Sequence, residues 1–183
     1  MIDLVLTLIG PDRPGLVEAV AQVVAQRGGN WLESRMINLG GQFAGILRVE
    51  VPPGQADDLA RALEALGATG LRVVAKSTPR AAGAGAHAAG DRPRVMDIEL
   101  VGLDRPGLVR EISQLLARQD INVEELTSDR SSAPMSGEML FRANARVKVP
   151  AQIDAAQLRA SLERLANDLT IEISLREQVA RST

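Results

Sequence analysis

The chain contains the same unit twice, and this repeat limits its possible folds more than any other feature. Residues 10–17 (GPDRPGLV) recur as residues 102–109 (GLDRPGLV), with six consecutive identities at an offset of 92 residues. The offset persists downstream, where Asn30 matches Asn122. Six residues are then added in the second copy, so Phe43 matches Phe141 at an offset of 98 residues. A chain of 183 residues with this repeat is expected to form two small domains of one fold.

Each copy has the apolar pattern of a βαββαβ unit. The first helix places Leu16 and Val24 on one face, and Gly28 and Gly29 follow as its stop. Gly67 is the predicted stop of the second helix. The pattern predicts strands at 2–9, 31–38, 43–51, 71–75, 95–101, 122–128, 138–149 and 170–176, and further helices at 55–66, 106–118 and 154–166. We therefore expect an α+β protein with two antiparallel four-stranded sheets, each carrying helices on one face.

The two predicted domains are joined by a segment of different composition. Alanine and glycine dominate STPRAAGAGAHAAGDRP, and no apolar period runs through it. We assign domain 1 to residues 1–76, a flexible linker to 77–94, domain 2 to 95–177 and a tail to 178–183. A tether of this kind raises the effective concentration of each domain for the other.

Composition excludes several classes of function. Lys and Arg (21) nearly balance Asp and Glu (23), so binding nucleic acid directly by charge is not expected. The chain has no cysteine, and its one histidine, His87, lies in the predicted linker. We therefore expect no metal site, no cofactor and no enzymatic activity. No apolar run reaches the roughly 20 residues of a membrane span, so we expect no membrane association and a cytoplasmic location.

The repeated loop between the first strand and the first helix is the best candidate for a ligand site. Asp12 and Asp104 are predicted to cap the following helices, with Pro14 and Pro106 in the first helical turn. The glycine that follows each proline allows close approach of another group. Unpaired amides at a helix start, with the positive end of the helix dipole, suit a carboxylate. The sequence thus offers a carboxylate pocket twice.

The repeated asparagines extend this prediction. Asn30 and Asn122 lie where the chain leaves the first helix for the second strand, a bend expected within reach of a neighbouring unit's loop. An asparagine side chain both donates and accepts hydrogen bonds, so it could hold the ammonium and carboxylate of a free amino acid. Asp12 or Asp104 would supply the negative charge opposite that ammonium.

A purely structural explanation of these residues stays open beside the ligand hypothesis. Asp-x-Pro-Gly is also a helix-start signal that the fold needs whether or not anything binds. The two asparagines could serve only to adopt a left-handed turn. Arg13 and Arg105 could contact carboxylates, although exposure to solvent is the ordinary state of arginine. Trp31 is predicted to fill the core or an interface.

These motifs carry a resemblance to a known family. The βαββαβ unit with G-x-D-R-P-G-L-V at its first strand–helix junction resembles the ACT domain, a small regulatory module that senses amino acids. The likeness covers residues 1–76 and 95–177. Within the ACT superfamily the chain resembles the glycine cleavage system transcriptional repressor group, through GGNWLESRMINLGGQFAGILRVEVP in the first half and INVEELTSDRSSAPMSGEMLF in the second.

The resemblance implies a ferredoxin-like fold, paired domains that form a continuous sheet, and small ligands held between units. It implies a homo-oligomer as well. The ligand-contacting positions of the family fall on Asp12, Arg13, Pro14, Gly15, Leu16 and Asn30, and on Asp104, Arg105, Pro106, Gly107, Leu108 and Asn122.

The expected function is therefore a non-enzymatic regulator that senses a small amino acid, with glycine as the first candidate. Repression of glycine cleavage genes would act through a DNA-binding transcriptional activator as the protein partner. One alternative is a structural or dimerisation ACT scaffold without a ligand. Another is a regulatory piece related to the ACT units of formyltetrahydrofolate deformylases.

Overall fold

The computed structural model describes residues 1–78, 93–133 and 137–177. The chain divides into two compact units, Met1–Gly85 and Ala86–Thr183. Within the described residues, strand residues Ser77, Thr78 and Arg94 lie inside the segment predicted as a linker. Residues 79–92 of that predicted linker, which include His87, and the predicted tail lie outside the described residues.

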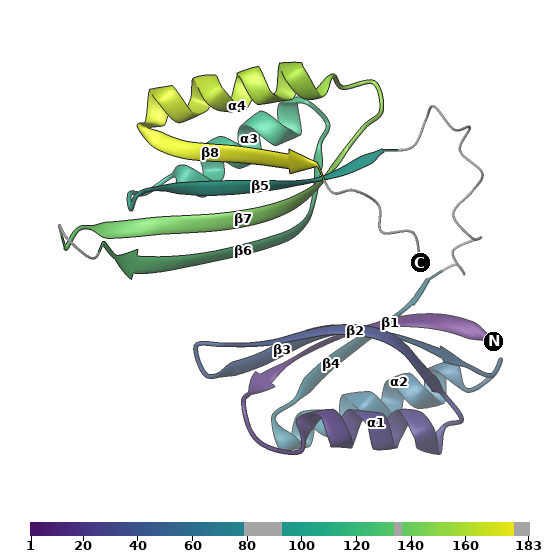
Figure 1. The fold of residues 1–183 in the computed structure, drawn as a ribbon. Coiled ribbons are helices and arrows are strands. Elements are labelled where there is room, and N and C mark those ends of the chain that lie inside the picture. The colour runs from purple at the N-terminus through teal and green to yellow at the C-terminus, as the bar shows by residue number, and fades with distance from the viewer. Residues whose placement is uncertain (79–92, 134–136, 178–183) are drawn as a thin grey trace. The chain divides into compact units, whose positions relative to one another are not determined.

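The first unit has the predicted βαββαβ order (Figure 1). Its elements are β1 (Ile2–Pro11), α1 (Leu16–Gln26), β2 (Asn30–Leu39), β3 (Gln42–Val51), α2 (Ala56–Glu64), a short 3-10 helix η1 (Ala65–Thr69) and β4 (Arg72–Thr78). The four strands form one sheet in the order β2-β3-β1-β4, with every neighbouring pair antiparallel.

The second unit repeats this topology in its own residues. Its elements are β5 (Arg94–Leu103), α3 (Leu108–Arg118), β6 (Asn122–Ser132), β7 (Met139–Val149), α4 (Ala155–Leu169) and β8 (Ile171–Glu177). The sheet order is β6-β7-β5-β8, again antiparallel throughout. Both units even carry the same irregularity, a register shift between Trp31 and Glu33 in β2 and between Val123 and Glu125 in β6. The predicted fold class is confirmed.

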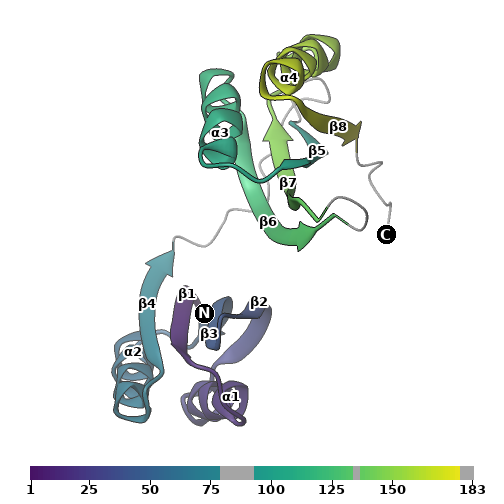
Figure 2. The same cartoon turned by 90° about the vertical axis from the view of Figure 1, so that its left-hand side faces the viewer.

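The core of each unit lies between one face of the sheet and its two helices (Figure 2). Alternate residues of β1, such as Leu4, Leu6 and Leu8, point into the first core, while their neighbours face the opposite side of the sheet. Leu59 and Leu63 of α2 are fully buried against this layer. One face of each sheet is thus apolar and covered, as the strand alternation requires.

Three predicted helix boundaries are wrong, and all three errors come from glycine. Gly67 does not end the second helix, because η1 runs through it to Thr69 and Gly70 takes the left-handed conformation (φ 86°). Pro14 and Pro106 do not lie in the first turns of α1 and of the first helix of the second unit, because Gly15 and Gly107 precede those helices with φ 90° and 100°. A positive φ is strained for a residue with a Cβ, so these positions favour glycine. Gly28, by contrast, has φ 65° just after α1, as predicted for a helix stop.

Candidate functional site

The repeated loop follows the first strand of each unit and is tied to the tip of a β-hairpin. The N–H of Asp12 donates to the carbonyl of Gly41 (2.9 Å), at the turn between β2 and β3. The N–H of Asp104 donates to the carbonyl of Met139 (2.8 Å), at the start of β7. The backbone of the loop is therefore held in the same way in both units.

The predicted capping role of the two aspartates is wrong. The N-cap residues of α1 and α3 are Gly15 and Gly107, with φ 90° and 100°, and neither helix has a side-chain cap. Because the left-handed glycine turns the chain into the helix, each aspartate lies four residues before the first helical residue, and its side chain faces the second strand of its unit. The Asp12 carboxylate accepts a hydrogen bond from the Asn38 amide. The carboxylate of Asp104 instead forms an ion pair with Arg130 (2.5 Å).

The helix start itself differs between the units. Around Gly15, a Cβ would meet no other atom within 4 Å, so the start of α1 is open. A Cβ at Gly107 would lie 3.6 Å from Glu111 Oε1, so a carboxylate already lies beside the start of α3. Arg105 reaches the same glutamate (3.5 Å). The space beside Gly15 is thus open, whereas the Glu111 carboxylate lies beside Gly107, although the first turn of α1 also carries an acidic residue, Glu18.

The remaining loop residues divide into exposed and buried positions. Pro14 and Pro106 are exposed, and the exposed Arg13 donates a hydrogen bond to the carbonyl of Thr69. Leu16 and Leu108 are only 5% and 2% exposed, because their side chains belong to the hydrophobic interior. These two leucines therefore leave only their backbone for a ligand.

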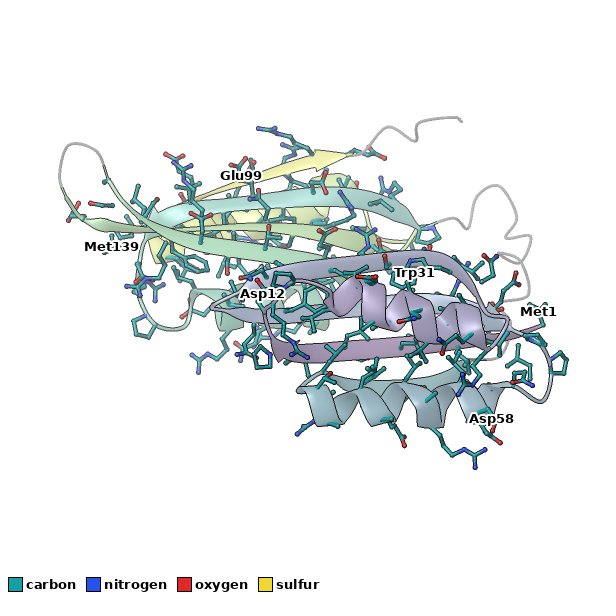
Figure 3. All side chains as sticks on the ribbon, turned by 90° about the horizontal axis from the view of Figure 1, so that it is seen from below. Met1, Asp12, Trp31, Asp58, Glu99 and Met139 are labelled. Atoms are coloured by element: carbon teal, nitrogen blue, oxygen red, sulfur yellow. The ribbon has the colours of Figure 1, made fainter. Side chains whose placement is uncertain are left out.

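The predicted asparagines lie at the far end of the sheet from the loop of their own unit. Asn30 pairs with Glu50, which pairs with Asp3, whereas the loop follows Pro11. Eight residues along β1 from Asp3 to Pro11 span about 26 Å at roughly 3.3 Å per residue. In Figure 3 Asp12 and Trp31, the neighbour of Asn30, lie toward opposite ends of the first unit.

The second unit shows the same separation. Asn122 pairs with Lys148, which pairs with Val95, whereas the loop follows Leu103. Neither unit therefore brings its own asparagine and loop together.

Asn30 and Asn122 do not adopt the left-handed backbone conformation that was considered for them from the sequence. Asn30 donates to Glu50 Oε1 (3.2 Å) and begins β2. Among the described residues, the non-glycine positions with positive φ are Asp120 and Thr170, so neither Asn30 nor Asn122 adopts that conformation. Asp120 stands where the first unit has Gly28. The prediction for Trp31 is confirmed, because its ring is half-buried against the first core.

Sequence reasoning missed the contrast between the uncovered faces of the two sheets. In the first unit five aliphatic side chains on that face are about half or more exposed, namely Ile9, Ile37, Leu39, Ile46 and Val74. Both faces carry an ion-paired arginine at the same register, Arg48 with Glu33 (3.9 Å) in the first unit and Arg146 with Asp97 (3.6 Å) and Glu125 (3.1 Å) in the second. The faces differ because the second unit has Asn144 where the first has Ile46, and Ser174 where the first has Val74. Comparing alternate strand residues between the two copies would have revealed this difference.

The described residues contain no group of three or more His, Asp or Glu side chains placed to hold a metal ion. Within the same residues, no helix is both long and apolar enough to span a membrane. The chemistry that the loop offers is the binding of charged groups by backbone amides, carboxylates and an amide side chain.

Comparison with known proteins agrees with the fold and the repeat. Family models described as the ACT domain match residues 3–73 and residues 96–165. The chain is 25% identical over 173 residues to the glycine cleavage system transcriptional repressor of Escherichia coli (strain K12), covering 94% of this chain and 88% of that protein.

Solved structures extend the likeness over nearly the whole length. A crystal structure of an unknown protein from Galdieria sulphuraria has a TM-score of 0.83 and 26% identity, covering 97% of this chain and 99% of the other. A candidate glycine cleavage system transcriptional repressor of known structure has a TM-score of 0.68 at 23% identity, covering 97% of each chain. The chain thus belongs to the ACT-domain family, with one ACT domain in each of its two units.

Proposed function

We propose that this chain is a non-enzymatic regulator that binds a small amino acid, with glycine as the first candidate, and acts on transcription through a protein partner. The observation that carries the proposal is the open helix start at Gly15, three residues after Asp12 in the same loop. The name of the Escherichia coli relative supports the regulatory part.

The first unit provides groups for both ends of an amino acid. The first amides of α1 have no carbonyl partner within the helix, and the helix dipole adds positive potential where a ligand carboxylate would lie. Asp12 accepts only from the neutral amide of Asn38, so its negative charge remains available to an ammonium group. In the second unit Arg130 already neutralises Asp104. We therefore assign the stronger site to the first unit.

A site that includes Asn30 needs a loop from another ACT unit, because its own loop lies about 26 Å away at roughly 3.3 Å per residue. Such a shared site links ligand binding to the pairing of units. A ligand changes that pairing only through its different affinity for the paired and unpaired states. This coupling is the physical basis we propose for sensing, within a homo-oligomer or within one chain.

The near-neutral charge of the chain leads us to place DNA contact in the partner. The proposed partner is a DNA-binding transcriptional activator. Tight, salt-dependent binding of duplex DNA by the purified chain in an electrophoretic mobility assay would contradict this part of the proposal.

The test of sensing is a panel of free amino acids followed by thermal unfolding and by Trp31 fluorescence. A ligand at about a hundred times its dissociation constant adds roughly 2.7 kcal/mol to the free energy of unfolding. We expect glycine or another small amino acid to raise the unfolding midpoint, and Asp12→Ala, Asn30→Ala or Asn122→Ala to weaken that rise.

The matched control is Asn167→Ala, which removes an exposed asparagine on α4 and should leave the ligand response unchanged. If no amino acid in the panel shifts the midpoint, the sensor proposal fails. The scaffold hypothesis then takes its place, and affinity capture of the partner would be the next experiment.

A further inference from the structure

The second unit contains an apolar pocket between α3 and the helix-facing side of its sheet. The pocket holds about 170 Å³, and ten of its eleven lining residues are apolar. Ser113 is the polar member, and its hydroxyl donates to the carbonyl of Val109 (2.7 Å). With that hydroxyl engaged, the lining favours an uncharged occupant over a charged one.

The first unit fills the matching place with its own side chains. Trp31 lies in the same register as Val123, since they pair with Val49 and Val147 respectively. Trp31 packs against the first core as a half-buried residue. Replacing an indole by an isopropyl group at this position removes an aromatic ring from the space beneath the helix.

A second exchange lies next to the pocket. Met36 pairs with Gly45 in the first unit, and Ser128 pairs with the lining residue Ala143 in the second. Met36 lies so close to the sheet that a Cβ at Gly45 would be 2.8 Å from its Cγ. The second unit thus has a hydroxymethyl group where the first has a thioether chain. The exchange of Trp31 for the lining residue Val123 removes a large side chain from the space, and the shorter Ser128 lies beside it.

The pocket is open to solvent along the edge of the sheet. Val109, Val123 and Leu126 line it and are 41%, 38% and 48% exposed, whereas Leu116 is 1% exposed. A small molecule can therefore enter past the three half-exposed residues and reach the buried one. Apolar cavities of about 150 Å³ stay dry and hold benzene-sized molecules, which matches the size of this pocket.

We propose that the pocket between α3 and β6–β7 binds an uncharged aromatic or branched aliphatic group of side-chain size. The group could belong to a neutral small molecule or to the side chain of a free hydrophobic amino acid. The proposal uses none of the loop residues of the amino-acid site. It can therefore be tested separately from the proposed sensor function.

The test is titration of the whole chain with indole, followed by NMR of carbon-13-labelled methyl groups. We expect saturable shifts at Ile112, Leu116 and Val123, with no saturable shift at Val20 and Val24 of the first unit. Absence of saturable shifts up to the solubility limit of indole would overturn the proposal, as would equal shifts in both units.

Parallel titrations with phenylalanine and leucine identify the source of the group. If these amino acids shift the same methyl groups at lower concentration than indole does, the occupant is an amino-acid side chain. If indole alone shifts them, the site takes a neutral molecule. Either result supports a binding pocket in the second unit.

A variant that copies the first unit provides the decisive control. Val123→Trp should fill the pocket and weaken indole binding at least tenfold, while Val74→Trp, at an exposed valine of the first sheet, should leave binding unchanged. Ala143→Leu, at a lining residue of β7, fills the pocket from the neighbouring strand and serves if Val123→Trp disturbs the amide spectrum. Unchanged indole binding in a folded filling variant would place the ligand elsewhere and refute the proposal.

A second copy of the chain is the competing occupant. Sedimentation velocity and a soluble paramagnetic agent distinguish it, because an interface would protect the methyl groups of Val123 and Leu126 in an oligomer. Protection of both residues without indole binding would overturn the ligand proposal.

Discussion

The two units have the same backbone plan but different contacts at the loop that was duplicated. Asp12 faces a neutral amide and Gly15 faces open space, whereas Asp104 is paired with Arg130 and Gly107 lies beside Glu111. The hairpin contact that holds the loop is nevertheless retained in both. Duplication has therefore preserved the parts that shape the loop while the charges around it have diverged. A shared motif does not imply two equivalent binding sites.

The two units also differ in the side chains on the helix-facing side of their sheets. The first unit packs Trp31 and Met36 against its core, and the second has Val123 and Ser128 at those places beside an apolar pocket. The first unit instead exposes aliphatic side chains on its uncovered face. Each unit thus leaves a different apolar surface exposed.

The largest expected effect concerns the glycine one residue before the end of the first strand of each unit. A Cβ at Gly10 would lie 2.5 Å from the carbonyl oxygen of Gly70, which is backbone, whereas at Gly102 the nearest atom is Cγ2 of Ile171. Gly10→Ala should lower the free energy of unfolding by about 3 kcal/mol and Gly102→Ala by about 2 kcal/mol, because a side chain yields more easily than backbone. Urea unfolding followed by Trp31 fluorescence and circular dichroism measures both.

The control for this pair is Ile171→Ala in the Gly102→Ala background. Removing the Ile171 methyl groups should recover part of the loss relative to the Ile171→Ala single variant. Equal losses at Gly10 and Gly102, with no recovery, would show that the two contacts are equivalent.

The next prediction concerns a substitution that gives the first unit the residue type found at the matching position of the second. Trp31→Val should lower the free energy of unfolding by about 2 kcal/mol, because it removes a half-buried ring from contact with the core. Calorimetry measures the loss, since the variant has no tryptophan. The control is Leu39→Val, a truncation at an exposed strand residue, which should change stability by less than about 0.5 kcal/mol. A neutral Trp31→Val would mean that this ring does not support the first core.

A smaller effect is expected after the first helix of each unit. Gly28 and Asp120 occupy matching positions with φ 65° and 55°, and only the glycine adopts this conformation without steric cost. Asp120→Gly should raise the free energy of unfolding by about 1 kcal/mol, and Gly28→Ala should lower it by about 1 kcal/mol. Thermal unfolding of both variants tests the pair. Opposite signs are required, so a change of the same sign in both would refute the explanation.

The smallest expected effect is the difference in salt dependence between the contacts of Asp104 and of Asp12. The Asp104–Arg130 ion pair lies at the surface, so a double-mutant cycle with Asp104→Asn and Arg130→Gln should give a coupling of about 0.5 kcal/mol that falls as salt is added. The matching cycle with Asp12→Asn and Asn38→Ala should show little dependence on salt, because Asn38 carries no charge. Equal salt dependence in the two cycles would remove the electrostatic distinction between the sites.

The repeat and the apolar alternation of the sequence are sufficient to predict two copies of a βαββαβ unit. The apolar run of residues 2–9 predicted β1, and the offset of 92 residues predicted that the second unit would copy the first. These features are local, since they depend on the period of a strand or helix and on residues close in the chain.

The tertiary structure alone decided which residues lie together in space. Spacing suggested that Asp12 caps α1, but the left-handed Gly15 begins that helix and the carboxylate turns toward Asn38 of β2. The sequence suggested that Asn30 lies within reach of a neighbouring unit's loop, and antiparallel pairing adds that it lies at the opposite end of the sheet from the loop of its own unit. The pocket beneath α3 depends on residues of three strands and a helix. Side-chain partners and cavities arise from long-range packing, which the periodicity of a sequence does not encode.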